Sequence, residues 1–167
     1  MGKRNGISYG KLILVPALIT LGITLLRLCL ELVGAPAWLA SRAPGGPGAI
    51  IGISWLPPIF GIYFAYKLTG ISSGIWKSLF ITLFLYGLAA RIPVIIIMGL
   101  AIYGNWGTHY DAFAPGVYSD ATPTMRFLQG GVMVQLVWWL VIWTIGSGML
   151  TGLITSRILS RSRRKPN

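Results

Sequence analysis

The sequence predicts an all-α, polytopic membrane protein: one domain, residues 1–167, that folds as a bundle of four transmembrane helices. Three observations support this fold class. The chain is 54% hydrophobic and only 10% charged, whereas soluble domains are about 25% charged. Four long apolar runs alternate with polar or Gly/Pro-rich connectors. Lysine and arginine gather in alternate connectors, which is typical of multi-pass membrane proteins.

The four spans are expected at about residues 12–33, 49–66, 78–103 and 127–156. A helix needs about 20 residues to cross the hydrocarbon core, so the second run is barely long enough. Pro57-Pro58 lies in the middle of that run. Because proline removes a helical hydrogen bond and clashes with the preceding turn, we expect the second helix to be broken there. The break would leave free backbone carbonyls near Ile53 and Ser54.

The distribution of basic residues predicts the topology. Ten of the fourteen lie in the N-terminal head, the connector 67–77 and the tail 157–167. The connectors 34–48 and 104–126 carry only Arg42 and Arg126. Because lysine and arginine are retained on the cytoplasmic side, we expect both termini to be cytoplasmic and the protein to lie in a cell or inner membrane.

The basic start and first apolar run also fit a secretory signal peptide. Arg27 and Glu31 interrupt that run before the Ala35-Pro36-Ala37 sequence that would be cleaved, and its length suits a span. We therefore interpret it as the first transmembrane helix.

The net charge of +11 indicates which partners to expect. Basic residues beside membrane spans contact anionic lipids, so we expect membrane lipids as partners, including anionic lipid at the basic tail, and no nucleic acid. Gly148 and Gly152 form a Gly-x-x-x-Gly spacing that favours close helix approach. That approach is compatible with packing inside the bundle, with a homo-oligomer or with a larger membrane complex.

Polar residues inside the spans form the candidate site. Arg91 falls near the middle of the third span, where a charge is costly unless protein or water surrounds it. A rise of 1.5 Å per residue places the other candidates in the outer half or beside the proline break. We therefore expect an outward-facing, net-positive ligand-binding pocket lined by Arg91, Arg27, Glu31, Gln135 and Ser54.

A structural role for the same residues is the alternative. Arg27 can pair with Glu31, four residues later on the same helix face. Arg91 would donate to the carbonyls freed by the prolines, and Gln135 would bond across a helix pair. Trp143 is expected near the depth of Arg91, where its ring could make a cation–π contact with the guanidinium.

The loop 104–126 is the one long connector, and it contains a candidate lid: Trp106, His109, Tyr110 and Asp111. One histidine and two loop acids fall short of a zinc site, and the single Cys29 excludes a cysteine-rich one. We expect no metal, no cofactor and no catalytic residues.

The leading hypothesis is therefore a small membrane carrier, channel or binding protein for an anionic group, such as a carboxylate or a lipid phosphate. The alternative is an accessory subunit of a larger membrane complex. A third hypothesis is a lipid-modifying enzyme that uses His109 and Asp111 as acid and base.

Overall fold

The computed structural model describes residues 8–34, 53–69, 74–108, 110 and 121–162. Within these ranges every regular element is a helix and there is no strand. The elements are α1 (Tyr9–Leu32), the 3-10 turn η1 (Ile53–Trp55), α4 (Leu56–Leu68), α5 (Ile75–Gly104), α6 (Pro123–Arg126), the π-helix η2 (Phe127–Ser147) and α7 (Gly148–Ser162).

Three helices are long and apolar enough to cross a membrane: α1, α5 and the continuous helix Pro123–Ser162. The described part of the chain is therefore helical, and the length and composition of these three helices are those of membrane spans. Helix α4 has 13 residues, which corresponds to about 20 Å and is shorter than the hydrocarbon core.

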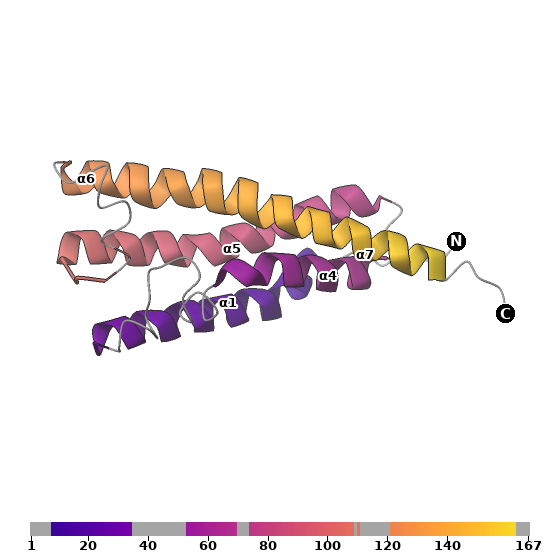
Figure 1. Cartoon of the computed structure of the whole chain (residues 1–167), viewed down its shortest axis with the longest axis horizontal. Helices are drawn as coiled ribbons and strands as arrows, with labels where there is room; N and C mark the ends of the chain where they lie inside the picture. Colours follow the sequence, from indigo (N-terminus) through magenta and orange to yellow (C-terminus); the bar gives the residue numbers. More distant parts are fainter. Residues whose placement is uncertain (1–7, 35–52, 70–73, 109, 111–120, 163–167) are drawn as a thin grey trace.

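The helices lie side by side along the long axis of the molecule (Figure 1). The Tyr9 hydroxyl donates to the Ser78 hydroxyl at 3.5 Å, so α1 and α5 begin at the same end and run the same way. The Thr151 hydroxyl donates to the Pro58 carbonyl at 2.9 Å, which joins the starts of α4 and α7. These two helices run back toward the end where α1 and α5 begin.

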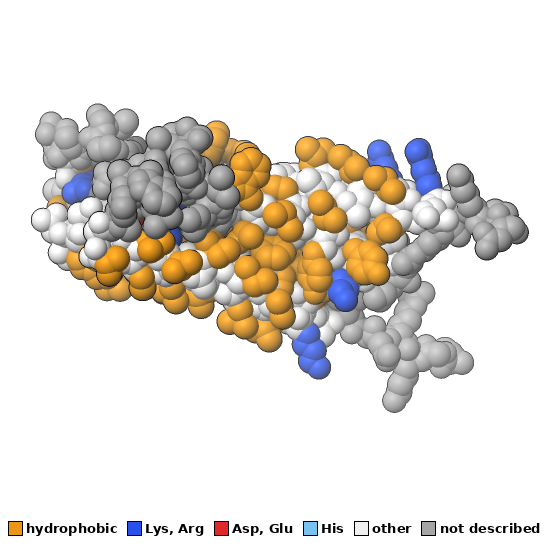
Figure 2. All heavy atoms as spheres, turned by 60° about the horizontal axis from the view of Figure 1, so that its bottom comes forward, with side chains coloured by type: hydrophobic (Ala, Val, Ile, Leu, Met, Phe, Trp, Pro, Cys, Tyr) orange, Lys and Arg blue, Asp and Glu red, His pale blue; other side chains and the backbone are white. Residues whose placement is uncertain are grey.

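That shared end is the basic end of the molecule. Figure 2 shows apolar side chains over the middle of one face and lysine and arginine gathered toward its right-hand end. The described residues that contribute lie at the starts of α1 and α5 and at the ends of α4 and α7: Lys11, Lys77, Lys67, Arg157 and Arg161.

The start of α4 corrects the expected second span. Pro57 and Pro58 do not interrupt the middle of a helix at 49–66; they occupy the first turn of α4, which continues to Leu68. Proline is favoured there because the first N–H groups of a helix have no intrahelical acceptor. The change from 3-10 to α geometry falls directly before the prolines, and residues 49–52 lie outside the described ranges.

Helices α4 and α7 approach closely because glycines face each other. A Cβ at Gly61 would lie 2.6 Å from the Thr151 hydroxyl oxygen, and one at Gly152 would lie 2.9 Å from the Gly61 carbonyl oxygen. Only glycine fits such an approach. The Gly148/Gly152 spacing therefore packs within the chain.

Helix η2 winds as a π-helix over 21 residues, although π geometry is mostly seen as single turns. Its buried positions include Gly130, Gln135, Leu140 and Thr144, which recur at intervals of about five residues instead of the three or four of an α-helix. The Thr144 hydroxyl donates to the Trp139 carbonyl five residues earlier, at 2.7 Å. The winding changes which η2 side chains face α5.

Two apolar clusters fill the interior along α5. The first lies toward the basic end and contains Phe60, Phe64, Leu68, Leu79, Leu83, Tyr86 and Ala90. The second lies toward the opposite end and contains Val94, Ile97, Met98, Ala101 and Tyr110, with Leu28 and Ile53 packed against it. Arg91 is the residue of α5 directly after the first cluster, so it lies between the two.

Candidate functional site

Arg91 is the buried charge of the bundle. It lies 16 residues from the start of α5 and 13 from its end, and only 3% of its surface is exposed. Helix α5 places it there because the buried residues Gly87, Ala90 and Val94 share its helix face. Protein side chains therefore surround Arg91, as the cost of a charge at this depth requires.

The partners of Arg91 come from η2. Its Nη1 donates to the Gln135 Oε1 at 3.5 Å, the limit for a hydrogen bond. The Gln135 Nε2 lies 3.6 Å from the Met98 Sδ, a weak acceptor. The guanidinium also lies over the Trp139 ring, 5.1 Å from its centroid. The hydrogen bond to Gln135 and the contact with the Trp139 ring are both weak partners for a full positive charge.

The Nε of Arg91 is buried and has no hydrogen-bond partner among the described residues. Within those residues, no carboxylate lies at ion-pair distance from the guanidinium. Buried polar groups in proteins are normally paired, and an orphan one needs an explanation. Arg91 is therefore the feature of the site that the fold alone does not account for.

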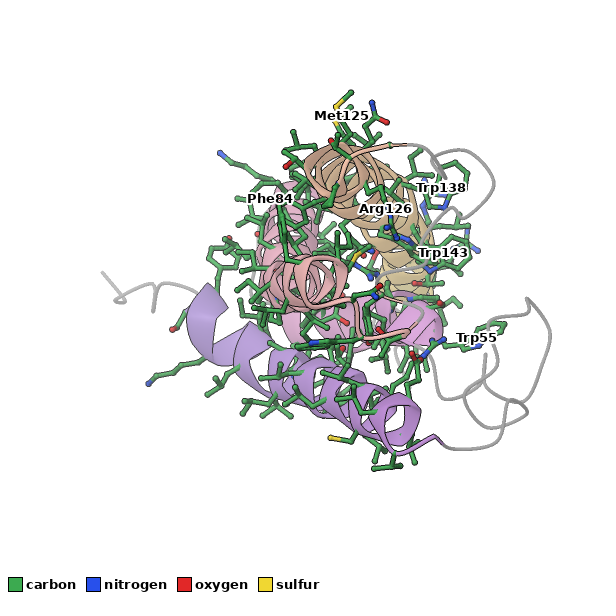
Figure 3. All side chains as sticks on the ribbon, turned by 90° about the vertical axis from the view of Figure 1, so that its left-hand side faces the viewer. Trp55, Phe84, Met125, Arg126, Trp138 and Trp143 are labelled. Carbon is green, nitrogen blue, oxygen red and sulfur yellow. The ribbon has the colours of Figure 1, made fainter. Side chains whose placement is uncertain are left out.

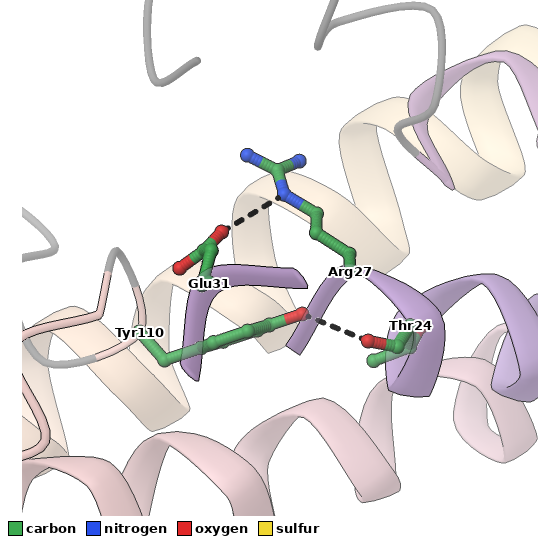
Figure 4. A network of polar contacts seen from close by, with 4 residues as sticks. All are labelled: Thr24, Arg27, Glu31 and Tyr110. Atoms are coloured by element: carbon green, nitrogen blue, oxygen red, sulfur yellow. Dashed lines mark hydrogen bonds and ion pairs between the residues drawn. The ribbon is translucent and has the colours of Figure 1, made fainter. Parts of the chain in front are cut away.

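A second polar cluster lies on α1, at the end away from the basic end (Figure 4). The Arg27 Nε donates to the Glu31 Oε1 at 3.3 Å, with side-chain exposures of 22% and 8%. The predicted pairing of these two residues is confirmed. The Tyr110 hydroxyl donates to the Thr24 carbonyl at 3.4 Å beside this pair.

Tyr110 fixes the loop after α5 onto α1. Its ring is 5% exposed and packs in the second apolar cluster. Burial raises the pKa of the Tyr110 hydroxyl to about 12, which the nearby Arg27 opposes and Glu31 reinforces. The phenol is thus held neutral against α1. Trp106 of the candidate lid is 38% exposed, while His109 and Asp111 lie outside the described residues.

The Ser54 carbonyl is engaged by tryptophan. The Trp143 Nε1 donates to the Ser54 carbonyl oxygen at 2.7 Å. The expected donation from Arg91 to the carbonyls near the prolines is wrong for Ser54, because Arg91 donates to Gln135 instead. The expected cation–π partner is also wrong: Trp139, and not Trp143, lies over Arg91. Depth along a helix does not determine which face a side chain occupies: Trp139 lies over Arg91, and Trp143 reaches Ser54.

The predicted pocket residues fall into separate groups. Arg91 meets Gln135, and Arg27 meets Glu31. Ser54 is connected to Arg91 only through tryptophans, since the Trp139 and Trp143 rings pack edge to face with centroids 6.5 Å apart. The second apolar cluster has members near both groups in the sequence: Val94 follows Arg91 on α5, and Leu28 follows Arg27 on α1.

Sequence reasoning missed the polar contacts that hold α1 to α5. The Tyr86 hydroxyl lies 2.9 Å from the Thr20 hydroxyl, and both side chains are buried. Thr20 and Thr24 also donate to carbonyls four residues earlier. The signal was available, because two threonines four residues apart in an apolar run mark one helix face. No group of histidine, cysteine or acidic residues that could hold a metal occurs in the described part of the chain.

Comparisons with known proteins give no relative for this chain. No family model, no curated protein and no solved structure matches it. The functional argument therefore rests on the geometry of the site.

Proposed function

We propose that this chain is a small membrane carrier, channel or binding protein that takes an anionic group, a carboxylate or a lipid phosphate, at Arg91. The observation that carries the proposal is the buried guanidinium whose Nε has no partner among the described residues. A charge in such surroundings costs several kcal/mol. An anion would offset that cost when it binds.

The available donors suit a carboxylate or phosphate. A guanidinium presents parallel N–H groups that match two oxygens of either anion. The Nη1 of Arg91 is only weakly engaged, at 3.5 Å from Gln135. The Gln135 Nε2 faces the poor acceptor Met98 Sδ, so it can be redirected to an anion without losing a strong bond.

The proposed roles of the other residues follow from their contacts. Arg27 and Glu31 hold each other at 3.3 Å, so Glu31 orients Arg27 on the outward side of the site. The three charged residues Arg91, Arg27 and Glu31 sum to +1. Tyr110 packs in the second apolar cluster and donates to the Thr24 carbonyl, so it fills the outward side of the site.

We further propose that the molecule forms a four-span bundle with its basic end and both termini in the cytoplasm. The segregation of Lys11, Lys67, Lys77 and the arginines of α7 supports this orientation. Cysteines at Ser73 and Asp111, two positions outside the described residues, test it after Cys29 is replaced. An impermeant thiol reagent should label position 111 on intact cells. Labelling of position 73 alone would contradict the orientation.

The anion site is tested by the melting temperature of delipidated protein. A ligand that binds the folded state raises Tm in proportion to ln(1 + [L]/Kd). Carboxylates and phosphates with and without acyl chains should include at least one that raises the Tm of the wild type. Arg91→Lys should fold and show a smaller shift, because lysine lacks the planar fork. Arg91→Gln should abolish the shift.

Lys77→Gln is the matched control, because it removes one positive charge at the exposed basic end. It should leave the ligand-induced shift unchanged. If no anion shifts the wild type, and both Arg91 variants melt far below it, Arg91 is a structural residue. The accessory-subunit hypothesis would then be favoured, and foreign subunits in stoichiometric amount should appear in a native mass after gentle extraction.

A further inference from the structure

The route by which a ligand reaches Arg91 can be inferred from what surrounds it. Along the bundle axis, both directions are filled. Phe60, Tyr86 and Ala90 of the first apolar cluster lie toward the basic end. Val94, Met98 and Tyr110 of the second cluster lie toward the other end. A hydrated anion would have to cross either apolar layer and lose its water there.

The lateral direction differs, because aromatic side chains connect Arg91 to the exposed surface of the bundle. Trp139 covers the guanidinium at 5.1 Å and is itself only partly buried. Its ring packs edge to face on Trp143, which is 37% exposed. The contact of Arg91 with Trp139 and the contact of Trp139 with Trp143 therefore connect the buried charge to the surface of the bundle.

The surface reached in this way is a tryptophan face. Trp143, Trp138 and Trp55 lie on the same side of the bundle, the side opposite Phe84 (Figure 3). Trp138 and Trp55 are 55% and 60% exposed. Indole rings are apolar but carry one N–H, so they suit contact with both acyl chains and lipid headgroups.

One hydrogen bond closes the seam between η2 and η1 on this face. The Trp143 Nε1 donates to the Ser54 carbonyl at 2.7 Å. The carbonyl belongs to the 3-10 turn directly before α4, where the prolines prevent a continuous helix. The bond therefore joins two segments that the backbone ladder does not connect.

We propose that this seam is the lateral access route to Arg91, and that the anion is the headgroup of a lipid whose chain stays in the bilayer. The inference rests on the proposed anion site and adds its ligand class and its route. The seam opens when Trp143 leaves Ser54, and Trp139 then guides the headgroup to the guanidinium. A phosphate monoester or a carboxylate on an acyl chain has the required chemistry.

The first test compares ligands on the wild type and needs no variant. Lysophosphatidic acid and glycerol 3-phosphate carry the same phosphate and differ in the acyl chain. We expect lysophosphatidic acid to raise Tm at a concentration at least tenfold lower than glycerol 3-phosphate, with Arg91→Gln insensitive to both. A monoacylglycerol, which has the same chain and glycerol but no phosphate, controls for the chain alone and should produce no shift that depends on Arg91.

The second test concerns the route. The dissociation rate of a fluorescent lysophosphatidic acid is measured by stopped flow, with unlabelled ligand in excess. Trp143→Phe keeps an aromatic ring and removes the donor to Ser54. It should speed dissociation about fivefold, the factor that corresponds to one typical hydrogen bond. Trp138→Phe, a nearby change on the same face, should leave the rate unchanged. Tyr110→Ala tests the alternative outward route: faster dissociation in this variant, without faster dissociation in Trp143→Phe, would contradict the lateral route.

The outcomes separate this inference from the proposed function. If glycerol 3-phosphate binds at Arg91 as tightly as lysophosphatidic acid, the ligand is a soluble anion and the lipid route is wrong, although the anion site stands. If Tyr110→Ala speeds exchange and Trp143→Phe behaves as Trp138→Phe does, the route is outward. If no anion binds in a way that depends on Arg91, both proposals fail.

Discussion

Arg27 and Arg91 both lie in apolar helices, but they differ in how exposed they are and in which partners they have. Arg27 is partly exposed, and its Nε is bonded to Glu31 one turn later on the same helix. Arg91 is almost fully buried, and its Nε has no described partner. The first arrangement is a neutral pair that the local sequence supplies. The second leaves a positive charge that nothing described in the chain neutralises.

The difference shows that the burial of an arginine and the presence of a partner for its charge need separate explanations. Arg27 could be kept for its ion pair alone, because i,i+4 pairs form on any helix of suitable sequence. Arg91 obtains a 3.5 Å bond from Gln135 and a ring face from Trp139. Such contacts give about 1–3 kcal/mol each, and a bond at the 3.5 Å limit lies at the low end. They fall short of the cost of a buried charge, which is why we assign Arg91 to ligand binding.

The largest expected effect comes from reversing each charge. Arg91→Glu would place a carboxylate against the negative face of the Trp139 ring, with no described cation nearby. We expect a loss of about 3–5 kcal/mol in the free energy of unfolding and little monodisperse protein on size exclusion. Arg27→Glu should cost about 1–3 kcal/mol, because its site is more exposed. Equal losses would contradict the contrast in burial.

Replacing each arginine by methionine should produce effects of opposite sign. Arg91→Met removes an uncompensated buried charge and should stabilise the ligand-free protein by about 1–3 kcal/mol. Arg27→Met takes the ion-pair partner from Glu31, whose side chain is 8% exposed, and should destabilise by about 1–3 kcal/mol. The measurement is Tm of both variants in delipidated form. A drop in both would mean that Arg91, like Arg27, is structural.

A third change makes the surroundings of Arg91 resemble those of Arg27. Gln135→Glu supplies a carboxylate where the amide oxygen now lies, 3.5 Å from the Nη1 of Arg91. We expect the ligand-free protein to gain about 1–2 kcal/mol from the charge-assisted bond. The built-in carboxylate should compete with the ligand and weaken its affinity at least tenfold. Gln135→Leu is the control, which weakens affinity without stabilising. Unchanged affinity in Gln135→Glu would place the ligand elsewhere.

The smallest expected effect concerns Tyr110 beside the Arg27–Glu31 pair. Tyr110→Phe removes a 3.4 Å hydrogen bond and should cost about 0.5–1 kcal/mol at neutral pH. Burial raises the pKa of Tyr110 from 10.0 to about 12. A raised pKa in the folded state favours the neutral phenol, so this stabilisation is present below pH 10 and lost as the pH rises toward 12.

The Tm difference between wild type and Tyr110→Phe should therefore shrink, and then change sign, above pH 10. Recording both proteins over pH 7 to 11 cancels the titration of the other tyrosines. A difference that stays constant over this range would show that Tyr110 is not buried against α1.

Several features of the fold and site were predictable from local spacing. The positions of α1, α5 and the last helix follow from apolar run length, and the Arg27–Glu31 pair follows from the i,i+4 rule. The contact of Gln135 with the neighbouring helix follows from the need to satisfy a buried amide.

Other features depended on information that spacing does not carry. A depth argument at 1.5 Å per residue does not say which face of η2 a side chain occupies, and it selected Trp143 where Trp139 meets Arg91. The prolines lie in the first turn of α4 because the 3-10 turn η1 comes directly before it. A run of apolar residues does not show where within it a helix begins. Tyr110 reaches α1 through a tertiary contact between residues far apart in the chain.

The most direct test of the central claim is a density map of the protein in a lipid nanodisc, at a resolution that shows the Gln135 side chain clearly. We predict non-protein density within hydrogen-bond distance of the Arg91 Nε, continuous with an acyl chain that leaves between Trp143 and Ser54. A map that shows Arg91 bonded only to protein groups or water, with no other density beside the guanidinium, would contradict the account.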